Sequence, residues 1–384
     1  MTDAIAYPRV VVPAGEDFLL LSPTEQAYAY RNVDRMFATR TVRRGGSTRQ
    51  LDRRAEILPN YEIDGRSYGV EDYIHRANVA GLLVLHNNSI VLERYSLGLE
   101  EGTRWSSMSM IKSLTSTLIG AAVADGAIAS LDDSVSTYIP QLRASAYDSV
   151  RVRDVLTMSS GVDWTEDYVD RNSHVNRYSK SLGDKVPGGV LALMRELSRK
   201  HPSGTTFNYN TGDSYILGCL VSAATGETLA DYMSRKIWSP FGMEFDAFYT
   251  LESEGGQEIG GSRAGMALRD FGRFGLFILG NGLIGNEPVL PANWVSDASH
   301  PWFRFGADTN RYGAAGYGYS WWIDADGAMV AVGFAGQSLY INRAKNVVIV
   351  TLSCHPQPPF SLGYSVDLRA EYYAFKAAVL RAIS

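Results

Sequence analysis

Strand-like segments stand near both ends of this chain, and a long stretch of helical patterning separates them. Residues 81–85 and 90–95 are rich in Leu, Val and Ile and flank an Asn-Asn-Ser turn, which predicts a hairpin. Near the other end, alternating apolar segments predict further strands over 316–324, 328–333, 338–342 and 347–353. We therefore expect one antiparallel sheet built from both chain ends and flanked by helices, an α+β fold.

The middle of the chain has a different texture. Its apolar residues recur at helical spacing between loops rich in Pro, Gly and Ser, over 152–158, 189–200 and 211–224. We expect an all-helical insertion domain over 128–257 and a discontinuous sheet domain formed by 1–127 and 258–384. The cleft between two such domains is the natural place for a binding site. The polar, arginine-containing residues 1–65 are expected to form a solvated arm.

Composition excludes several classes of protein. The 384 residues are 45% hydrophobic and 20% charged with a net charge of −5, which favours neither nucleic acid nor an anionic membrane as partner. The sequence contains no run of eighteen apolar residues, so it predicts no membrane span. Met1–Pro8 lacks the basic and apolar regions of a secretory signal, and Cys219 and Cys354 are expected to be free thiols, so we predict a cytoplasmic protein.

Nothing in the sequence predicts a cofactor or a metal. The histidines and cysteines have no metal-ligand spacing. The string Gly280-x-Gly282-x-x-Gly285 matches a dinucleotide fingerprint, but it follows a predicted helix instead of a strand. We interpret it as a helix end followed by a turn.

Ser109 and Lys112 form the pattern Ser-x-x-Lys at the start of an apolar helical stretch that reaches Ala124. Residues three apart share one face of a helix, so the hydroxyl and the amine are expected to lie side by side. A serine is a weak nucleophile until a neighbouring base takes its proton. This spacing makes Ser109 a candidate nucleophile and Lys112 a candidate base.

Several segments, in a fixed order, resemble one family of serine hydrolases. They are the Ser109 helix, Leu131–Pro140, Asp154–Gly161, Phe207–Thr211 and Ala267–Gly275. The chain resembles the superfamily of class C β-lactamases, DD-peptidases and esterases, and within it the 6-aminohexanoate-dimer hydrolases and related carboxylesterases. The resemblance implies a β-lactamase/transpeptidase-like fold and hydrolysis through an acyl-enzyme.

The resemblance also implies further site residues. Tyr209 matches the tyrosine of the family's Tyr-x-Asn motif and is expected to work with Lys112; which of the two accepts the Ser109 proton stays open. The backbone N–H groups of Ser109 and Phe334 are expected to form the oxyanion hole. Tyr168 is expected to donate a hydrogen bond to the leaving amine nitrogen. Trp105, Trp164, Trp321 and Trp322 are candidates for the lining of an apolar acyl pocket, but such residues more often pack in the core, so they are not counted as sites.

One departure from the family narrows the expected substrate. The Lys-Thr-Gly strand of the lactamases is replaced by Ala331-Val332-Gly333, so the strand carries no cation for a lactam carboxylate. We expect a cofactor-free amidase or esterase acting on a small linear amide, most like an aminohexanoate oligomer. A short-chain carboxylesterase is the alternative, and a β-lactamase or penicillin-binding peptidase is a weaker one. Whether the chain forms a homodimer is left open.

Overall fold

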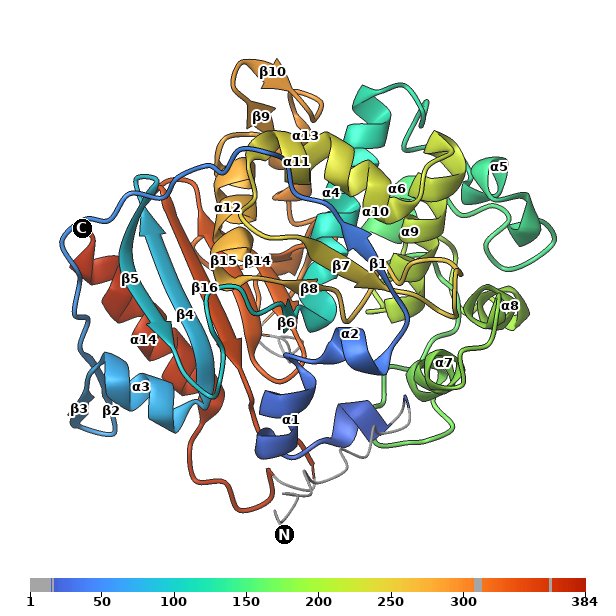
Figure 1. The fold of residues 1–384 in the computed structure, drawn as a ribbon. Coiled ribbons are helices and arrows are strands. Elements are labelled where there is room, and N and C mark those ends of the chain that lie inside the picture. The colour runs from blue at the N-terminus through green and yellow to red at the C-terminus, as the bar shows by residue number, and fades with distance from the viewer. Residues whose placement is uncertain (1–14, 16, 307–312, 359–360) are drawn as a thin grey trace, which may run out of the picture.

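An eight-stranded antiparallel sheet forms the centre of the molecule (Figure 1). The computed structural model describes residues 15, 17–306, 313–358 and 361–384. Both chain ends contribute to this sheet, as predicted, with the six later strands side by side and the two earlier ones at one end. The order is β11 (Phe303–Arg304), β12 (Gly316–Tyr317), β13 (Trp322–Ile323), β14 (Met329–Gly333), β15 (Gln337–Asn342), β16 (Val347–Ser353), β4 (Val79–His86) and β5 (Ser89–Tyr95).

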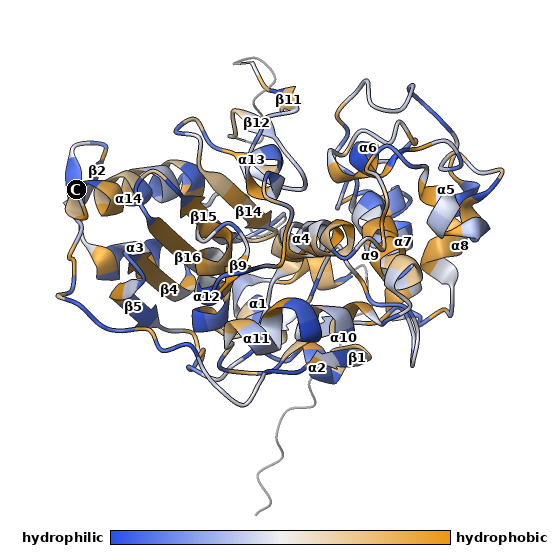
Figure 2. Ribbon diagram, turned by 90° about the horizontal axis from the view of Figure 1, so that it is seen from above, coloured by the Kyte–Doolittle hydropathy of each residue, from blue (hydrophilic) through white to orange (hydrophobic). Residues whose placement is uncertain are grey.

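The two chain ends meet where β16 pairs with β4. Val350 lies opposite Leu83 in this register, and every residue of β16 is buried. One face of the sheet packs on α12 (Leu268–Leu279) and α4 (Ile111–Ala124), while the other packs on α3 (Val70–Arg76) and α14 (Leu368–Ala382) (Figure 2). On that second face, Tyr73 of α3 stacks on Phe375 of α14 with ring centroids 3.9 Å apart. The sheet is thus buried on both faces.

Short helices fill the chain between α4 and β7 and lie beside the sheet (Figure 1). The longest of them, α9 (Thr211–Thr225), packs directly on α4. The others are α5 (Val135–Tyr138), η3 (Pro140–Leu142), α6 (Val152–Leu156), α7 (His174–Gly183), α8 (Gly189–Glu196), α10 (Leu229–Met233), η4 (Ser234–Trp238) and α11 (Ser239–Phe241). The domain boundaries themselves stay a prediction.

A second, four-stranded sheet links distant segments: β1 (Thr39–Val42), β7 (Ala247–Thr250), β8 (Gly265–Met266) and β6 (Trp105–Ser106). The expectation of a solvated arm is therefore wrong for β1, whose Arg40 pairs with the buried Glu258 at 2.7 Å. The remaining elements are η1 (Asp17–Leu20), α1 (Pro23–Ala29), α2 (Val33–Met36), β2 (Tyr61–Ile63), β3 (Arg66–Tyr68), β9 (Leu283–Ile284), β10 (Glu287–Pro288) and α13 (Trp294–Ala298).

Two local predictions have clear outcomes. The predicted strand 316–324 is broken into β12 and β13 by a turn in which Ser320 has φ +57°. The glycine string 280–285 ends α12 and forms the β9–β10 hairpin, as interpreted from the sequence.

Met1–Pro8 lies outside the described residues, so the structure does not test the expectation that this segment is not a secretory signal. Among the helices that are described, none is both long and apolar enough to cross a bilayer.

Candidate active site

Ser109 lies in η2 (Met108–Met110), a single tight turn directly before α4 begins. Met108 has φ +45°, a conformation that residues other than glycine rarely adopt. Neighbouring serines hold the turn: the Ser107 hydroxyl donates to the Met108 carbonyl at 3.0 Å, and the Met108 amide donates to Ser106 Oγ at 3.4 Å. Strain of this kind persists only where the surroundings fix the backbone, and here it sets the direction of the candidate nucleophile.

Lys112 lies one turn further along α4 and is only 2% exposed. Its Nζ donates to Ser109 Oγ at 3.1 Å, to Thr211 Oγ1 at 3.1 Å and to the Gly261 carbonyl at 2.5 Å. These three acceptors use all three protons of an ammonium group. The amine is therefore held against the serine hydroxyl by contacts from α9 and from the loop before β8.

The electrostatics of Lys112 suit a base. Burial lowers the pKa of Lys112 from its ordinary value to about 8, because the charged amine loses its hydration, and the Glu166 carboxylate opposes part of this shift. A lysine with this pKa is neutral in a substantial fraction of molecules at mildly alkaline pH. Only the neutral amine can accept a proton from Ser109.

Tyr209 comes from the loop before α9 and lies beside the same amine. Lys112 Nζ is 5.3 Å from the centroid of the Tyr209 ring, within cation–π range. Trp322 stacks on the Tyr209 ring with ring centroids 5.5 Å apart. The loop is fixed at its base because the Asn208 amide donates to the Met158 carbonyl at 2.8 Å and Asn210 caps α9. The structure thus brings Ser109, Lys112 and Tyr209 together.

Glu166 is a site residue that sequence reasoning missed. Its carboxylate accepts hydrogen bonds from the Thr211 hydroxyl, from the Thr211 amide at 3.2 Å, from the Trp164 indole and from the Tyr168 hydroxyl at 3.0 Å. Because Thr211 also accepts from Lys112, Glu166 is one side chain removed from the amine. The sequence did carry one signal for this residue. Glu166 lies two residues from Trp164 and two from Tyr168, and Tyr168 already had an expected role.

Tyr168 and Phe334 form another wall of the site beside Ser109. Their rings meet edge to face with centroids 4.9 Å apart. Phe334 follows β14 directly, and a Cβ placed on the preceding Gly333 would come within 2.6 Å of the Ser107 carbonyl. The strand end therefore approaches the Ser109 turn closely, which is the arrangement that the predicted pair of oxyanion donors requires.

These groups enclose a cleft of about 750 Å³. Ser109, Tyr209, Tyr168 and Phe334 all line it, whereas Lys112 lies behind Ser109. Trp164 and Trp322 also line the cleft although both are buried in the core, whereas Trp105 and Trp321 are 0% exposed and do not line it. The arrangement brings a serine hydroxyl, a buried amine and a phenol together in a cleft whose lining includes five aromatic residues.

Comparisons with known proteins show the family and the fold that the chain shares. The Beta-lactamase family model matches residues 70–374. The chain is 28% identical over 322 residues to the 6-aminohexanoate-dimer hydrolase of Paenarthrobacter ureafaciens, covering 80% of this chain and 79% of that protein. Among solved structures, it is similar to a putative 6-aminohexanoate-dimer hydrolase from Bacillus anthracis, with a TM-score of 0.79, 22% identity and coverage of 92% and 93%. A family VIII carboxylesterase has a TM-score of 0.57 at 12% identity, with coverage of 79% and 92%.

Proposed function

Because the chain belongs to the β-lactamase family, we propose that it is a serine hydrolase that forms an acyl-enzyme on Ser109 and cleaves small linear amides or esters. The leading substrate class is an amide of the aminohexanoate-oligomer type, and a short-chain ester is the second candidate. The observation that carries the proposal is the 3.1 Å hydrogen bond between Lys112 Nζ and Ser109 Oγ at the floor of the cleft.

Acylation begins when the Ser109 proton passes to neutral Lys112 or to a Tyr209 phenolate. Oγ forms a bond to the substrate carbonyl carbon, and the backbone N–H groups of Ser109 and Phe334 stabilise the resulting oxyanion. The carbon–nitrogen or carbon–oxygen bond then breaks as the proton taken from Ser109 passes to the leaving group, directly from Tyr209 or from Lys112 through Tyr209, which frees the base again. In the second half, water gives a proton to this base and its oxygen bonds to the acyl carbon. The base then returns the proton to Ser109 Oγ as the bond between Oγ and the acyl carbon breaks and the acid leaves.

The cleft wall argues against a β-lactam as the preferred substrate. Ala331 is 0% exposed and packs in the core, and the next residue, Val332, is an exposed aliphatic side chain. The strand beside Ser109 thus presents no cation to a lactam carboxylate. An ester or amide with no carboxylate close to the scissile bond fits this wall better, because a carboxylate there would lose hydration without a partner.

Intact-protein mass spectrometry tests the proposed function. The protein is incubated with p-nitrophenyl acetate, the linear aminohexanoate dimer and benzylpenicillin, and the mass is followed over time. We expect a transient acyl adduct from the ester or the amide, mapped to Ser109. A stable penicilloyl adduct together with nitrocefin turnover would instead assign a penicillin-interacting enzyme, and the lack of any adduct or turnover would assign a silent binding module.

We predict that Tyr168→Phe slows amides much more than activated esters. In the structure the Tyr168 hydroxyl donates to Glu166 at 3.0 Å, so donation to a leaving nitrogen requires this one proton to change partner. An amine leaves poorly unless it is protonated, whereas p-nitrophenolate needs no proton. The expected loss is roughly tenfold to a hundredfold in kcat/KM for the aminohexanoate dimer and under about threefold for p-nitrophenyl acetate. Equal loss on both substrates would contradict the role.

The pH profile tests the assignment of Lys112 as the base. If neutral Lys112 accepts the proton, kcat/KM rises with pH through about 8, where the amine loses its charge. Removing the Glu166 charge removes an interaction that raises the pKa of Lys112, so Glu166→Gln is expected to move this rise to lower pH. A fall in rate through pH 8 would instead show that charged Lys112 is needed and that Tyr209 accepts the proton.

A matched control separates this effect from general damage. Glu252 is a 5% exposed carboxylate that accepts a tyrosine hydrogen bond, from Tyr215 at 2.9 Å, and it does not line the cleft. Glu252→Gln is expected to leave the pH of the rise unchanged. A shift of equal size in both variants would show that Glu166 has no special effect on Lys112.

The finer expectations on location and assembly stay proposals. A cytoplasmic enzyme is consistent with Cys219 and Cys354, which are both free and buried. Size-exclusion chromatography with light scattering decides between a monomer and a homodimer.

A further inference from the structure

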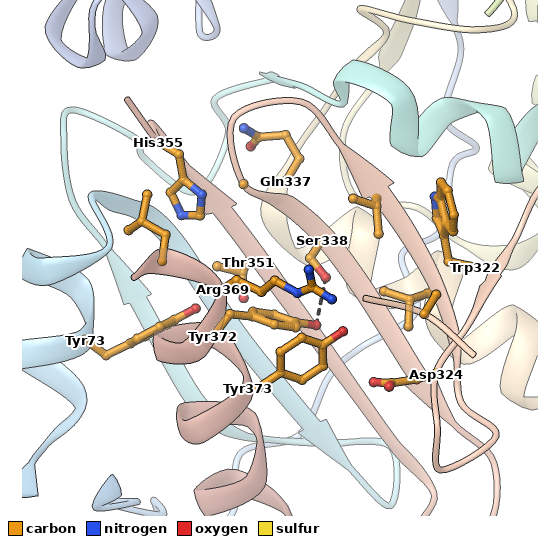
Figure 3. Close-up of a pocket in the computed structure, with 15 residues that line it drawn as sticks. Tyr73, Trp322, Asp324, Gln337, Ser338, Thr351, His355, Arg369, Tyr372 and Tyr373 are labelled. Atoms are coloured by element: carbon orange, nitrogen blue, oxygen red, sulfur yellow. Dashed lines mark hydrogen bonds between the residues drawn. The ribbon is translucent and has the colours of Figure 1, made fainter. Parts of the chain in front are cut away.

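A second cavity, of about 330 Å³, lies between the sheet and α14 (Figure 3). Aromatic rings from three elements line it: Tyr73 of α3, Trp322 of β13, and Tyr372 and Tyr373 of α14. Aliphatic side chains of β14 and of the start of α14 complete its walls. Nothing in the mechanism above uses this space.

Most of the polar groups in its walls are already paired within the protein, and the exception among the described residues is His355, whose buried Nε2 has no hydrogen-bond partner. The Gln337 amide donates to the Ser353 carbonyl at 2.7 Å and accepts from the Trp105 indole at 2.9 Å. Ser338 Oγ lies 3.0 Å from the Tyr372 hydroxyl, and Lys376 neutralises Asp324 through a short contact. Because most of these groups are satisfied, the walls offer few new hydrogen bonds to a ligand, and the cavity favours a hydrocarbon group over a polar one.

The other ionisable side chains do not change this conclusion. Burial lowers the pKa of His355 to about 4, so its ring is neutral at physiological pH. Arg369 extends across the cavity in Figure 3 and hydrogen-bonds with Tyr373. The cavity is therefore lined by several aromatic rings, and the positively charged Arg369 side chain is already hydrogen-bonded to Tyr373 in the cavity wall.

The second cavity adjoins the catalytic cleft. Trp322 and Val332 line both. On the β13 side, β14 is paired only at Met329 and Val330, so from Ala331 onward the strand has a free edge there. Val332 projects at this edge and is 42% exposed, although its neighbours in β14 are buried. An extended chain can pass from the cleft over Val332 and reach the α14 face without crossing the sheet.

The contacts also indicate which end of a substrate points this way. Tyr209, the group proposed to return a proton to the leaving group, stacks on Trp322, which is the wall between cleft and cavity. The side of Ser109 that faces Tyr209 and Trp322 is thus the leaving-group side.

We propose that the second cavity is a distal subsite for the hydrocarbon portion of the leaving group, an unbranched alkyl alcohol or alkylamine of several carbons. This assignment rests on the proposed acyl-enzyme function and specifies the substrate class of that same site. At about 30 Å³ for a water-sized group, the cavity has room for roughly ten such groups.

Acetate esters of straight-chain alcohols, from ethanol to 1-hexanol, test the subsite. All of them form the same acetyl-enzyme, so deacylation is identical and kcat/KM reports on acylation alone. For the methylenes that reach the cavity, kcat/KM is expected to rise by up to about fourfold for each one added. A mirror series, ethyl esters of acids from acetate to hexanoate, places the added methylenes on the acyl side.

Two variants narrow the route at different points. Val332→Phe obstructs the passage, and Ala314→Leu fills the cavity at a residue that does not line the cleft. In both, the ratio of kcat/KM for hexyl acetate to that for ethyl acetate is expected to fall at least tenfold. The matched control is Val186→Phe, because Val186 has the same side chain and the same 42% exposure as Val332 but lines neither space. Its ratio is expected to equal that of the wild type.

The outcomes distinguish a failure of the proposed subsite from a failure of the proposed function. If ethyl acetate is hydrolysed in a Ser109-dependent manner but the ratio is unchanged in both variants, the subsite is wrong and the proposed function stands. If the variants flatten the acyl series instead of the alcohol series, the assigned end is wrong. If no ester or amide is turned over at all, the proposed function itself fails.

Discussion

Ser109→Ala is expected to lower kcat/KM by about five orders of magnitude on p-nitrophenyl acetate and to abolish labelling by a fluorophosphonate. Removal of the nucleophile from a group of residues that act as a unit costs nearly as much as removal of the whole group. The variant is expected to fold normally, because Ser109 is partly exposed in the cleft and the turn around it is held by Ser106 and Ser107. Circular dichroism and a thermal melt check the fold.

Ser116→Ala is the matched control for this prediction. Ser116 is a buried serine of the same helix whose hydroxyl donates to the Tyr319 carbonyl at 2.6 Å, away from the cleft. Its loss is expected to cost about 1 kcal/mol in the free energy of unfolding and little activity. Residual labelling of Ser109→Ala at the rate of the wild type would show that another residue is the nucleophile.

Lys112→Met is expected to lower kcat/KM by about three to five orders of magnitude while the protein stays folded. Methionine fills a similar volume but cannot accept the Ser109 proton. The stability should change little because two effects oppose each other. The Gly261 carbonyl loses its donor, which costs about 1–3 kcal/mol, and a buried charge disfavoured by desolvation is removed.

Lys376→Met is the variant whose free energy of unfolding is compared with that of Lys112→Met. Lys376 is also buried, but it faces the carboxylate of Asp324. Lys376→Met leaves that carboxylate buried without its partner and is expected to cost about 3–5 kcal/mol. Urea denaturation measures both variants. A large loss of stability in Lys112→Met would mean that the lysine is structural, and its effect on activity could then not be assigned to proton transfer.

Local spacing in the sequence predicts one part of the site, the pair formed by Ser109 and Lys112. Ser109 and Lys112 lie three residues apart, and helical geometry alone places the amine against the hydroxyl. Tyr209 is a hundred residues away, so no periodicity could place it there, and it was assigned through the family resemblance. Its loop reaches the site because Met158, in the left-handed region with φ +55°, presents its carbonyl to Asn208.

Glu166 and the second cavity were beyond sequence reasoning for a common reason. Both are defined by partners that come from several distant segments. The Glu166 carboxylate acquires its place from Thr211, Trp164 and Tyr168, and the cavity exists only where α14 spans the ends of β14 and β15. The strand pattern was more accessible, since alternation predicts a strand, but the break at Ser320 depends on its carbonyl accepting from Ser113 of α4.

The pairing of β16 with β4 also has a consequence for biosynthesis. Val350 lies opposite Leu83, so the ribosome must add more than 260 residues after Leu83 before its partner strand exists. At about 5–20 residues per second, the β4–β5 hairpin waits on the order of 10 to 50 s with one edge unpaired. Until Phe334 is added, the nascent chain carries Ser109 and Lys112 but not the strand end proposed to supply the second oxyanion donor. The proposed hydrolysis therefore cannot begin before β14 is made, and the waiting hairpin exposes a strand edge to aggregation meanwhile.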